Sequence, residues 1–112
     1  MLEETAEVER RDFERIATRC PIKFRAEREN VLLEGTVRDI CDIGAGFFTR
    51  QKLVPDLRLE TWIELAMLLK PLNIRGKVIW AQRQDEGLWR AGIMFDEMAF
   101  IKIVKMLIGR NN

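Results

Sequence analysis

Short runs in which apolar and polar residues alternate, separated by turn residues about every ten positions, constrain the fold of this chain most strongly. A period of two places alternate side chains on one face of a strand, so each run predicts a β-strand with one buried face. The predicted strands are a run at 22–26, a second at 31–40, a short one that begins at Phe47, and three more at 57–69, 74–81 and 88–95. The run 57–69 is the least certain in type, since its length also suits a helix.

Turn residues separate these strands. We expect turns at Glu29-Asn30, at Pro55-Asp56 and at Lys70-Pro71, and a hairpin loop at residues 85–87. Residues 41–46 are expected to form a loop with two glycines that are free to adopt positive φ.

Alternation also predicts which side chains share a face. One expected face of the fourth strand holds Leu57, Leu59, Thr61, Ile63, Leu65 and Met67. In the fifth strand the expected face holds Ile74, Gly76, Val78 and Trp80.

The end of the chain predicts a helix. Asp96 can cap its N-terminus, and Gly109 is a suitable stop. Between them an amphipathic stripe follows the i, i+3, i+4, i+7 spacing: Phe100, Ile103, Val104 and Leu107. The chain is therefore expected to be mainly β, a small six-stranded antiparallel barrel with one C-terminal α-helix packed on its outside or end.

A chain of 112 residues suits one domain, which we place at residues 19–112. Residues 1–18 are charge-dense with few apolar anchors, and we expect them to form a flexible or partly helical N-terminal arm.

Composition argues against catalysis and against a metal site. The chain has no histidine, the commonest general base and transition-metal ligand, and its two cysteines lie far apart in sequence. The net charge of +1 provides no basic field for long nucleic acid. No apolar run is long enough to insert in a membrane, and the acidic N-terminus lacks a secretion signal, so we expect a cytoplasmic protein that is not an enzyme.

Two short polar stretches carry the functional information. Residues 10–15 read Arg-Arg-Asp-Phe-Glu-Arg, and residues 39–44 read Asp-Ile-Cys-Asp-Ile-Gly. Arginine forks match phosphate oxygens and the O6/N7 edge of guanine, and aspartate accepts from the opposite edge of that base. Together they predict a binding site for a phosphorylated guanine nucleotide.

The order of these stretches resembles the PilZ domain family, whose ligand is cyclic di-GMP. Arg11 and Arg15 match its RxxxR motif, and residues 39–44 match D/NxSxxG except at Cys41. Two later stretches, residues 76–80 and 90–95, are also similar to the family. The resemblance extends from Arg10 to the last helix, and implies a PilZ-like barrel.

The resemblance implies a role for each matching residue. Arg11 and Arg15 would bind phosphate oxygens and the Hoogsteen edge of guanine, and Asp39 would accept from guanine N1–H and the amino group. Gly44 would let the backbone approach closely and hold the turn. In this family, an arginine in the position of Arg10 is associated with the binding of two stacked cyclic di-GMP molecules.

Two further residues belong to the expected site. Trp80 could offer a stacking face for guanine, although a tryptophan in such a strand is more often a core residue. Cys41 replaces a serine hydroxyl by a thiol, which is a weaker hydrogen-bonding partner, so the substitution should weaken binding without abolishing it.

Three functional classes follow. The first is a cyclic di-GMP receptor, monomeric or weakly dimeric, whose arm becomes ordered on binding and which signals through a partner protein. A degenerate PilZ-like adaptor that acts by protein contact without the nucleotide is the alternative, and Cys41 is its main support. A barrel that binds single-stranded nucleic acid is disfavoured by the near-neutral charge. The non-functional interpretation of residues 10–15 is a solvated arm in which the arginines form ion pairs with neighbouring glutamates.

Overall fold

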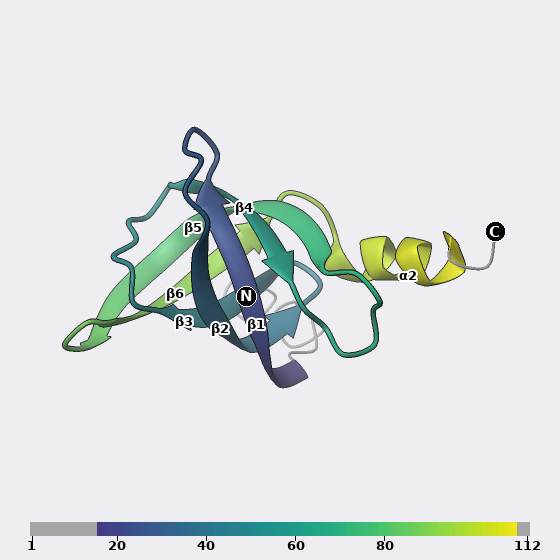
Figure 1. Ribbon diagram of the computed structural model, residues 1–112, viewed down its shortest axis with the longest axis horizontal. Coiled ribbons are helices and arrows are strands. Elements are labelled where there is room, and N and C mark those ends of the chain that lie inside the picture. The colour runs from purple at the N-terminus through teal and green to yellow at the C-terminus, as the bar shows by residue number, and fades with distance from the viewer. Residues whose placement is uncertain (1–15, 110–112) are drawn as a thin grey trace, which may run out of the picture.

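The computed structural model describes residues 16–109, which form six strands and one helix (Figure 1). Their bounds are β1 (Ile16–Ala26), β2 (Leu33–Cys41), β3 (Gly44–Thr49), β4 (Arg58–Ile63), β5 (Leu72–Asp85), β6 (Leu88–Phe95) and α2 (Ala99–Gly109). β1 therefore begins before Pro21 and includes the last three residues of the segment 1–18 that we assigned to the arm.

The strands close into an antiparallel barrel in the order β1-β2-β3-β6-β5-β4. Closure depends on β1, which pairs with β2 along one edge and with β4 along the other. The seam between β1 and β4 also carries a partly buried ion pair, in which Arg25 Nη2 lies 2.6 Å from Glu60 Oε1. The prediction of a six-stranded antiparallel barrel with a C-terminal helix is confirmed.

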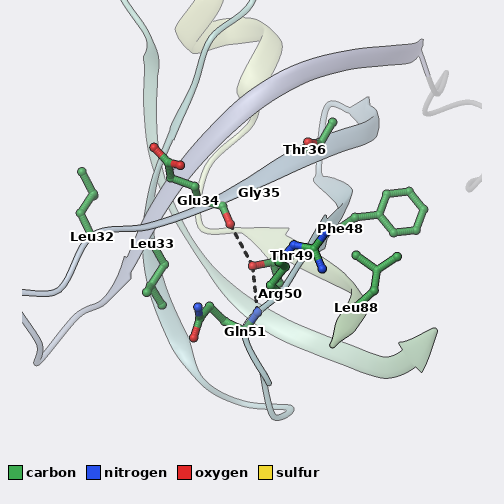
Figure 2. A pocket seen from close by; sticks show the side chains of 10 residues that line it. All are labelled: Leu32, Leu33, Glu34, Gly35, Thr36, Phe48, Thr49, Arg50, Gln51 and Leu88. Atoms are coloured by element: carbon green, nitrogen blue, oxygen red, sulfur yellow. Dashed lines mark hydrogen bonds between the residues drawn. The ribbon is translucent and has the colours of Figure 1, made fainter. Parts of the chain in front are cut away.

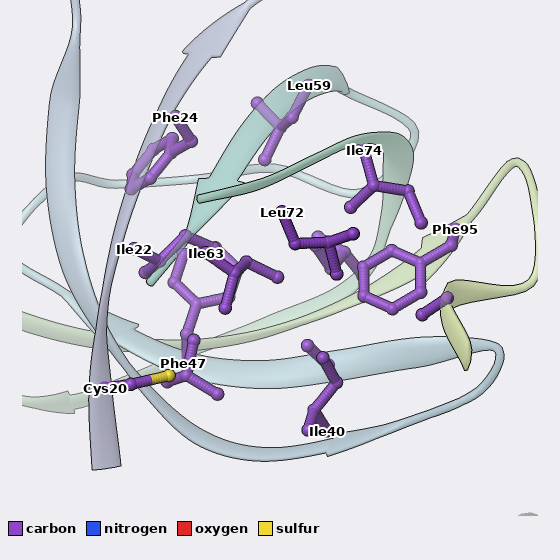
Figure 3. Packing of buried hydrophobic residues seen from close by; sticks show 14 of the residues in the cluster. Cys20, Ile22, Phe24, Ile40, Phe47, Leu59, Ile63, Leu72, Ile74 and Phe95 are labelled. Carbon is purple, nitrogen blue, oxygen red and sulfur yellow. The ribbon is translucent and has the colours of Figure 1, made fainter. Parts of the chain in front are cut away.

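The inward side chains of the strands fill the barrel with one apolar core (Figure 3). Phe24 on β1 and Phe47 on β3 meet there with ring centroids 5.3 Å apart. The largest fully buried side chains come from all six strands: Ile22, Phe24, Val37, Phe47, Leu59, Thr61, Ile63, Leu72, Ile74, Val78 and Ile93. This core fixes which face of each strand points outward.

Four register shifts interrupt the simple alternation of the described strands, and two of them are β-bulges that decide which residues of β2 and β5 face outward. The β2–β3 register shifts between Val37 and Asp39, and the β5–β6 register shifts between Val78 and Trp80. Each bulge inserts one extra residue and so reverses the face of the residues that follow. The expected face that united Val78 with Trp80 is therefore wrong, because Val78 is fully buried whereas Trp80 pairs in register with the outward Gly92.

β4 is shorter than the predicted strand 57–69. It ends at Ile63, the last residue that pairs with both β1 and β5. The chain then turns, since Leu65 N–H donates to the Ile63 carbonyl and Leu68 N–H donates to the Leu65 carbonyl. Leu65 stays buried, but Met67 is 57% exposed, so the shared face ends with the pairing.

The predicted glycine loop 41–46 is a tight turn of two residues, Asp42 and Ile43. Gly44 and Gly46 belong to β3, and neither has positive φ. The hairpin at residues 85–87 is confirmed, and there Gly87 does adopt a φ of 73°.

The N-terminus of α2 is capped by Asp42 rather than by Asp96. Phe100 N–H donates to Asp42 Oδ1 at 2.8 Å, and Ala99 N–H donates to the Asp42 carbonyl at 2.8 Å. Asp96 instead pairs with Arg58 on β4. The sequence could not show this, because the capping residue lies on a distant turn.

The buried face of α2 consists of Ala99 and Ile103, with Phe100, Met106 and Leu107 packed partly against the core. Val104, which we placed on this stripe, is 50% exposed. The helix projects away from the strands (Figure 1), so only a narrow side of it contacts the barrel.

Replacing Asp42 by alanine should remove the side-chain cap of α2. We expect the free energy of unfolding to fall by about 1 kcal/mol, as is usual for lost N-caps, together with faster hydrogen exchange at the Phe100 amide. Chemical denaturation and NMR-detected exchange measure both quantities. Asp42→Asn, which keeps an acceptor oxygen, is the control, and equal loss in both variants would contradict the capping role.

Candidate functional site

Four residues from four neighbouring strands form one row on the outer face of the barrel. Asp39 on β2 pairs with Gly46 on β3, Gly46 pairs with Gly92 on β6, and Gly92 pairs with Trp80 on β5. Two predicted site residues, Asp39 and Trp80, thus occupy the ends of the row, and two glycines lie between them. We call these four residues the outer row.

The two bulges place both ends of the outer row on the outside. Arg38 is the extra residue before Asp39, and Ile79 is the extra residue before Trp80. Without the first bulge Val37 and Asp39 would share the inner face. Bulges commonly re-aim side chains in this way next to functional sites.

The glycines provide the space that the outer row needs. A Cβ on Gly46 would lie 3.2 Å from Asp39 Oδ1, and a Cβ on Gly92 would lie 2.5 Å from Trp80 Cε2 and overlap with Nε1. The carboxylate and the indole therefore lean over glycine positions from the two ends of the row. Any larger residue at Gly92 would force the indole to move.

The Asp39 side chain is largely shielded but still reaches the surface, with 15% of it exposed. Arg38 Nε lies 3.5 Å from Asp39 Oδ2, so the extra residue of the bulge brings a guanidinium beside the carboxylate. The Asp39 carboxylate can accept hydrogen bonds from N–H groups along one edge of a ligand. The neighbouring Arg38 guanidinium can contact an anionic group of the same ligand.

Trp80 is half-buried, and the guanidinium of Arg90 lies over its ring, with Arg90 Cζ 5.3 Å from the ring centroid. This is a cation–π contact, and it holds a second positive charge at the Trp80 end of the outer row. Aromatic and guanidinium planes both serve as stacking surfaces for bases.

Cys41 and Gly44 lie next to the outer row. Both line a small pocket of about 90 Å³ together with Gly46, Trp80 and Gly92. The Cys41 side chain is a buried, free thiol. A Cβ on Gly44 would collide with the Ile93 carbonyl of β6, so glycine at this position lets the backbone of β3 approach β6 closely.

The three predicted arginines Arg10, Arg11 and Arg15 lie outside the described residues. The described chain starts at Ile16, which pairs with Ile40, and the next residue Ala17 pairs with Asp39. The segment that carries these arginines therefore joins the barrel beside Asp39.

Sequence reasoning missed four residues of this site: Arg38, Gly46, Arg90 and Gly92. A glycine inside a strand pattern is a recognised sign of a bulge or of close approach, and Gly92 carried that signal. The positions of Arg38 and Arg90 depend on the bulge and on cross-strand register, which the sequence does not reveal.

A larger pocket of about 630 Å³ lies elsewhere, along the ends of β2 and β3 (Figure 2). In its wall, Thr49 Oγ1 donates a hydrogen bond to the Glu34 carbonyl and accepts one from Gln51 N–H, so these polar groups already pair with one another. It contains no residue of the outer row and none of the predicted site residues.

Chemically, the site combines an acceptor for a donor edge, planar stacking groups and cations. Within residues 16–109, no group of three potential metal ligands comes together. Among the helices in that range, none has the length and apolar character needed to span a bilayer. The arrangement is that of a binding surface for a planar, anionic ligand.

Comparison with known structures agrees with this architecture. The motility inhibitor MotI (DgrA) of Bacillus subtilis matches with a TM-score of 0.65 and 11% identity, over 88% of this chain and 50% of that one. This chain therefore spans only half of MotI. The PilZ domain of CeSA from a cellulose-synthesising bacterium gives a TM-score of 0.60 and 15% identity, over 88% and 99% of the two chains.

A third structure is the PilZ domain of YcgR from Escherichia coli with c-di-GMP. It gives a TM-score of 0.59 and 17% identity, and the alignment covers 78% of each chain. At these identities the likenesses establish the fold. No curated protein matches the sequence significantly.

The sequence itself identifies the family. The family model of the PilZ domain matches residues 9–108, which include both motifs, all six strands and nearly all of α2. The chain belongs to the PilZ domain family, a family of cyclic di-GMP receptors.

Proposed function

We propose that this chain is a cyclic di-GMP receptor that binds the nucleotide over the outer row, between Asp39 and the arginines of residues 10–15. The observation that supports this most directly is the register of β1. Ala17 pairs with Asp39, so the chain that follows Arg15 runs directly past the carboxylate. In this proposal the start of β1 would bring both halves of the guanine-binding pattern to one end of the outer row.

Asp39 would accept the N1–H and amino hydrogens of one guanine. Arg11 and Arg15 would bind phosphate oxygens and the Hoogsteen edge, and Arg38 adds a cation 3.5 Å from the Asp39 carboxylate. Charge-assisted hydrogen bonds of this kind contribute roughly 1.5–3 kcal/mol each. Arg10 precedes this pair, and would serve a second, stacked nucleotide.

The glycines support the binding of a flat base. Neighbouring strands are spaced about 4.8 Å apart, so the three strand intervals from Asp39 to Trp80 span roughly 14 Å, and the Asp39 carboxylate and the Trp80 indole lean inward over the glycines from its two ends, where a base would contact them. Trp80 and Arg90 would close this space as a stacking edge. Because Arg90 already lies over the indole, a guanine that stacks there would share the site with the guanidinium.

The output of the receptor would be a change in its N-terminal arm. Nucleotide binding would draw residues 1–15 onto the barrel and present a new surface to a partner protein, in the cytoplasm. The adaptor alternative is favoured by one observation: Cys41 is a buried thiol at the position where the family motif has a serine.

The double substitution Arg11→Ala/Arg15→Ala should abolish measurable binding of cyclic di-GMP. Loss of two charged contacts at roughly 1.5–3 kcal/mol each corresponds to at least about a 100-fold loss of affinity. Isothermal titration calorimetry measures it. The matched control is Arg28→Ala/Arg83→Ala, which removes two exposed arginines remote from the outer row, and equal affinities in both double variants would refute the proposal.

Replacing Cys41 by serine should tighten nucleotide binding by up to about tenfold. A hydroxyl forms a stronger hydrogen bond than a thiol, and one neutral bond contributes roughly 0.5–1.5 kcal/mol. Cys20→Ser is the control, since Cys20 is also buried but packs in the core, where burial raises the pKa of its thiol. If the wild type fails to bind and Cys41→Ser binds, the adaptor alternative is correct for the natural chain.

Gly92→Ala should displace the Trp80 indole and weaken nucleotide binding several-fold. The new Cβ would overlap with Trp80 Nε1, so the indole N–H resonance of Trp80 should shift in NMR spectra. Gly109→Ala is the control, because a Cβ there meets nothing within 4 Å. An unmoved resonance with unchanged affinity would remove Trp80 from the site.

A further inference from the structure

The helix α2 is apolar on two opposite sides. Its inner side packs on the barrel through Ala99 and Ile103. On its outer side Ile101, Val104 and Ile108 are 53%, 50% and 58% exposed. Their spacing of i, i+3 and i+7 aligns them along one side of the helix, and we call them the outer stripe. Helices that are apolar all round are normally covered on every side.

The surface beside the helix is also apolar. A groove of about 360 Å³ between α2 and the β4–β5 loop is lined by Leu68, Leu69, Lys70, Met106 and Gly109. Leu69 is 78% exposed. Met106 packs partly against the core, so this groove lies on a different side of α2 from the outer stripe and forms a separate apolar surface.

The charges on α2 indicate what the outer stripe would accept. Within residues 99–109 the charged residues are Lys102 and Lys105, and both are basic. Lys102 is paired with Glu97 at 3.5 Å. Lys105 is exposed and borders the stripe, since it follows Ile101 by four residues and precedes Ile108 by three.

Self-association fits this pattern poorly. Antiparallel pairing of two α2 helices about a twofold axis would set Ile101 against Ile108 of the other copy. The same axis passes next to Lys105, so the two lysines would lie close together and repel each other. A partner with carboxylates beside its apolar residues would instead attract them.

We propose that the outer stripe is the docking surface for an amphipathic helix of a partner protein, with acidic residues flanking its apolar face. An 11-residue helix is about 16 Å long, so it matches a partner segment of about three turns. The contact is smaller than a stable interface and suits a reversible, regulated interaction.

The outer stripe is also connected to the nucleotide motif. Asp42, inside the motif 39–44, accepts hydrogen bonds from the first two residues of α2, and the Ile43 carbonyl accepts from Phe95 N–H at 2.8 Å. A shift of the motif turn on ligand binding would therefore move the N-terminus of α2. This connection to the ligand rests on the proposed function, whereas the docking surface does not.

The test uses the full chain labelled with ¹⁵N and two synthetic helical peptides that share one leucine stripe, flanked either by glutamates or by lysines. The glutamate peptide should shift the amides of the outer stripe and bind at least about tenfold more tightly than the lysine peptide at low salt. Val104→Glu should weaken its binding at least about tenfold, since a carboxylate on the stripe repels it. Val54→Glu is the matched control, because Val54 on the β3–β4 loop is also 50% exposed.

Equal binding of the two peptides, shifts outside α2 and the β4–β5 loop, or an unaffected Val104→Glu variant would overturn the proposal. So would sedimentation of the wild type as a dimer that Val104→Glu makes monomeric, since the occupant would then be a second copy. Titration of cyclic di-GMP into wild type and Val104→Glu should give equal affinities. If neither binds the nucleotide, the receptor function fails, and the peptide results still decide the docking surface.

Discussion

Closure of the barrel by β1 is the constraint on which the rest of the structure depends. The pairing of β1 with β2 extends as far as Phe24, and its pairing with β4 extends as far as Ala26. Each strand therefore has two neighbours, and no edge of the sheet is left open. Closure also decides which face of every strand is inside, because the enclosed volume is filled mainly by apolar side chains. The same strand runs past Asp39 at its start, where Ala17 pairs with that residue, and so one element both closes the core and contacts the motif 39–44.

The outer row is a consequence of this enclosed core. Val37 and Val78 are fully buried, and the chain can expose Asp39 and Trp80 two residues later only by inserting a bulge after each valine. At each bulge one residue is left unpaired in the strand ladder, and the side chain of the following residue points outward. Gly46 and Gly92 then leave room above the sheet for the Asp39 carboxylate and the Trp80 indole, at a cost in strand propensity.

The sequence predicted the architecture well because alternation reports burial directly. Ile22 and Phe24 in β1, and Ala91, Ile93 and Phe95 in β6, follow a strict period of two and all are buried. The errors occur where a longer-range contact decides the outcome. Trp80 lies outside because of a bulge, β4 stops at Ile63 because the chain turns there opposite the first residue of β5, and Asp42 caps α2 because the fold brings a distant turn to it.

The candidate site was predictable to a different degree. Asp39, Cys41 and Gly44 follow from a motif, and the structure gathers them around one pocket or row. Arg38, Gly46, Arg90 and Gly92 join them only through cross-strand register, which a local pattern does not contain.

The motif turn serves two purposes at once. Asp39 and Cys41 lie on the side of the outer row. The next two residues form hydrogen bonds to other elements: Asp42 accepts from the start of α2, and the Ile43 carbonyl accepts from the end of β6. A turn of two residues has little freedom to satisfy one set of contacts independently of the other. Any ligand that repositions Asp39 must therefore either strain the Asp42 cap or carry α2 with it. Because α2 has a narrow contact with the barrel and an uncovered apolar side, moving the helix costs less than breaking the turn.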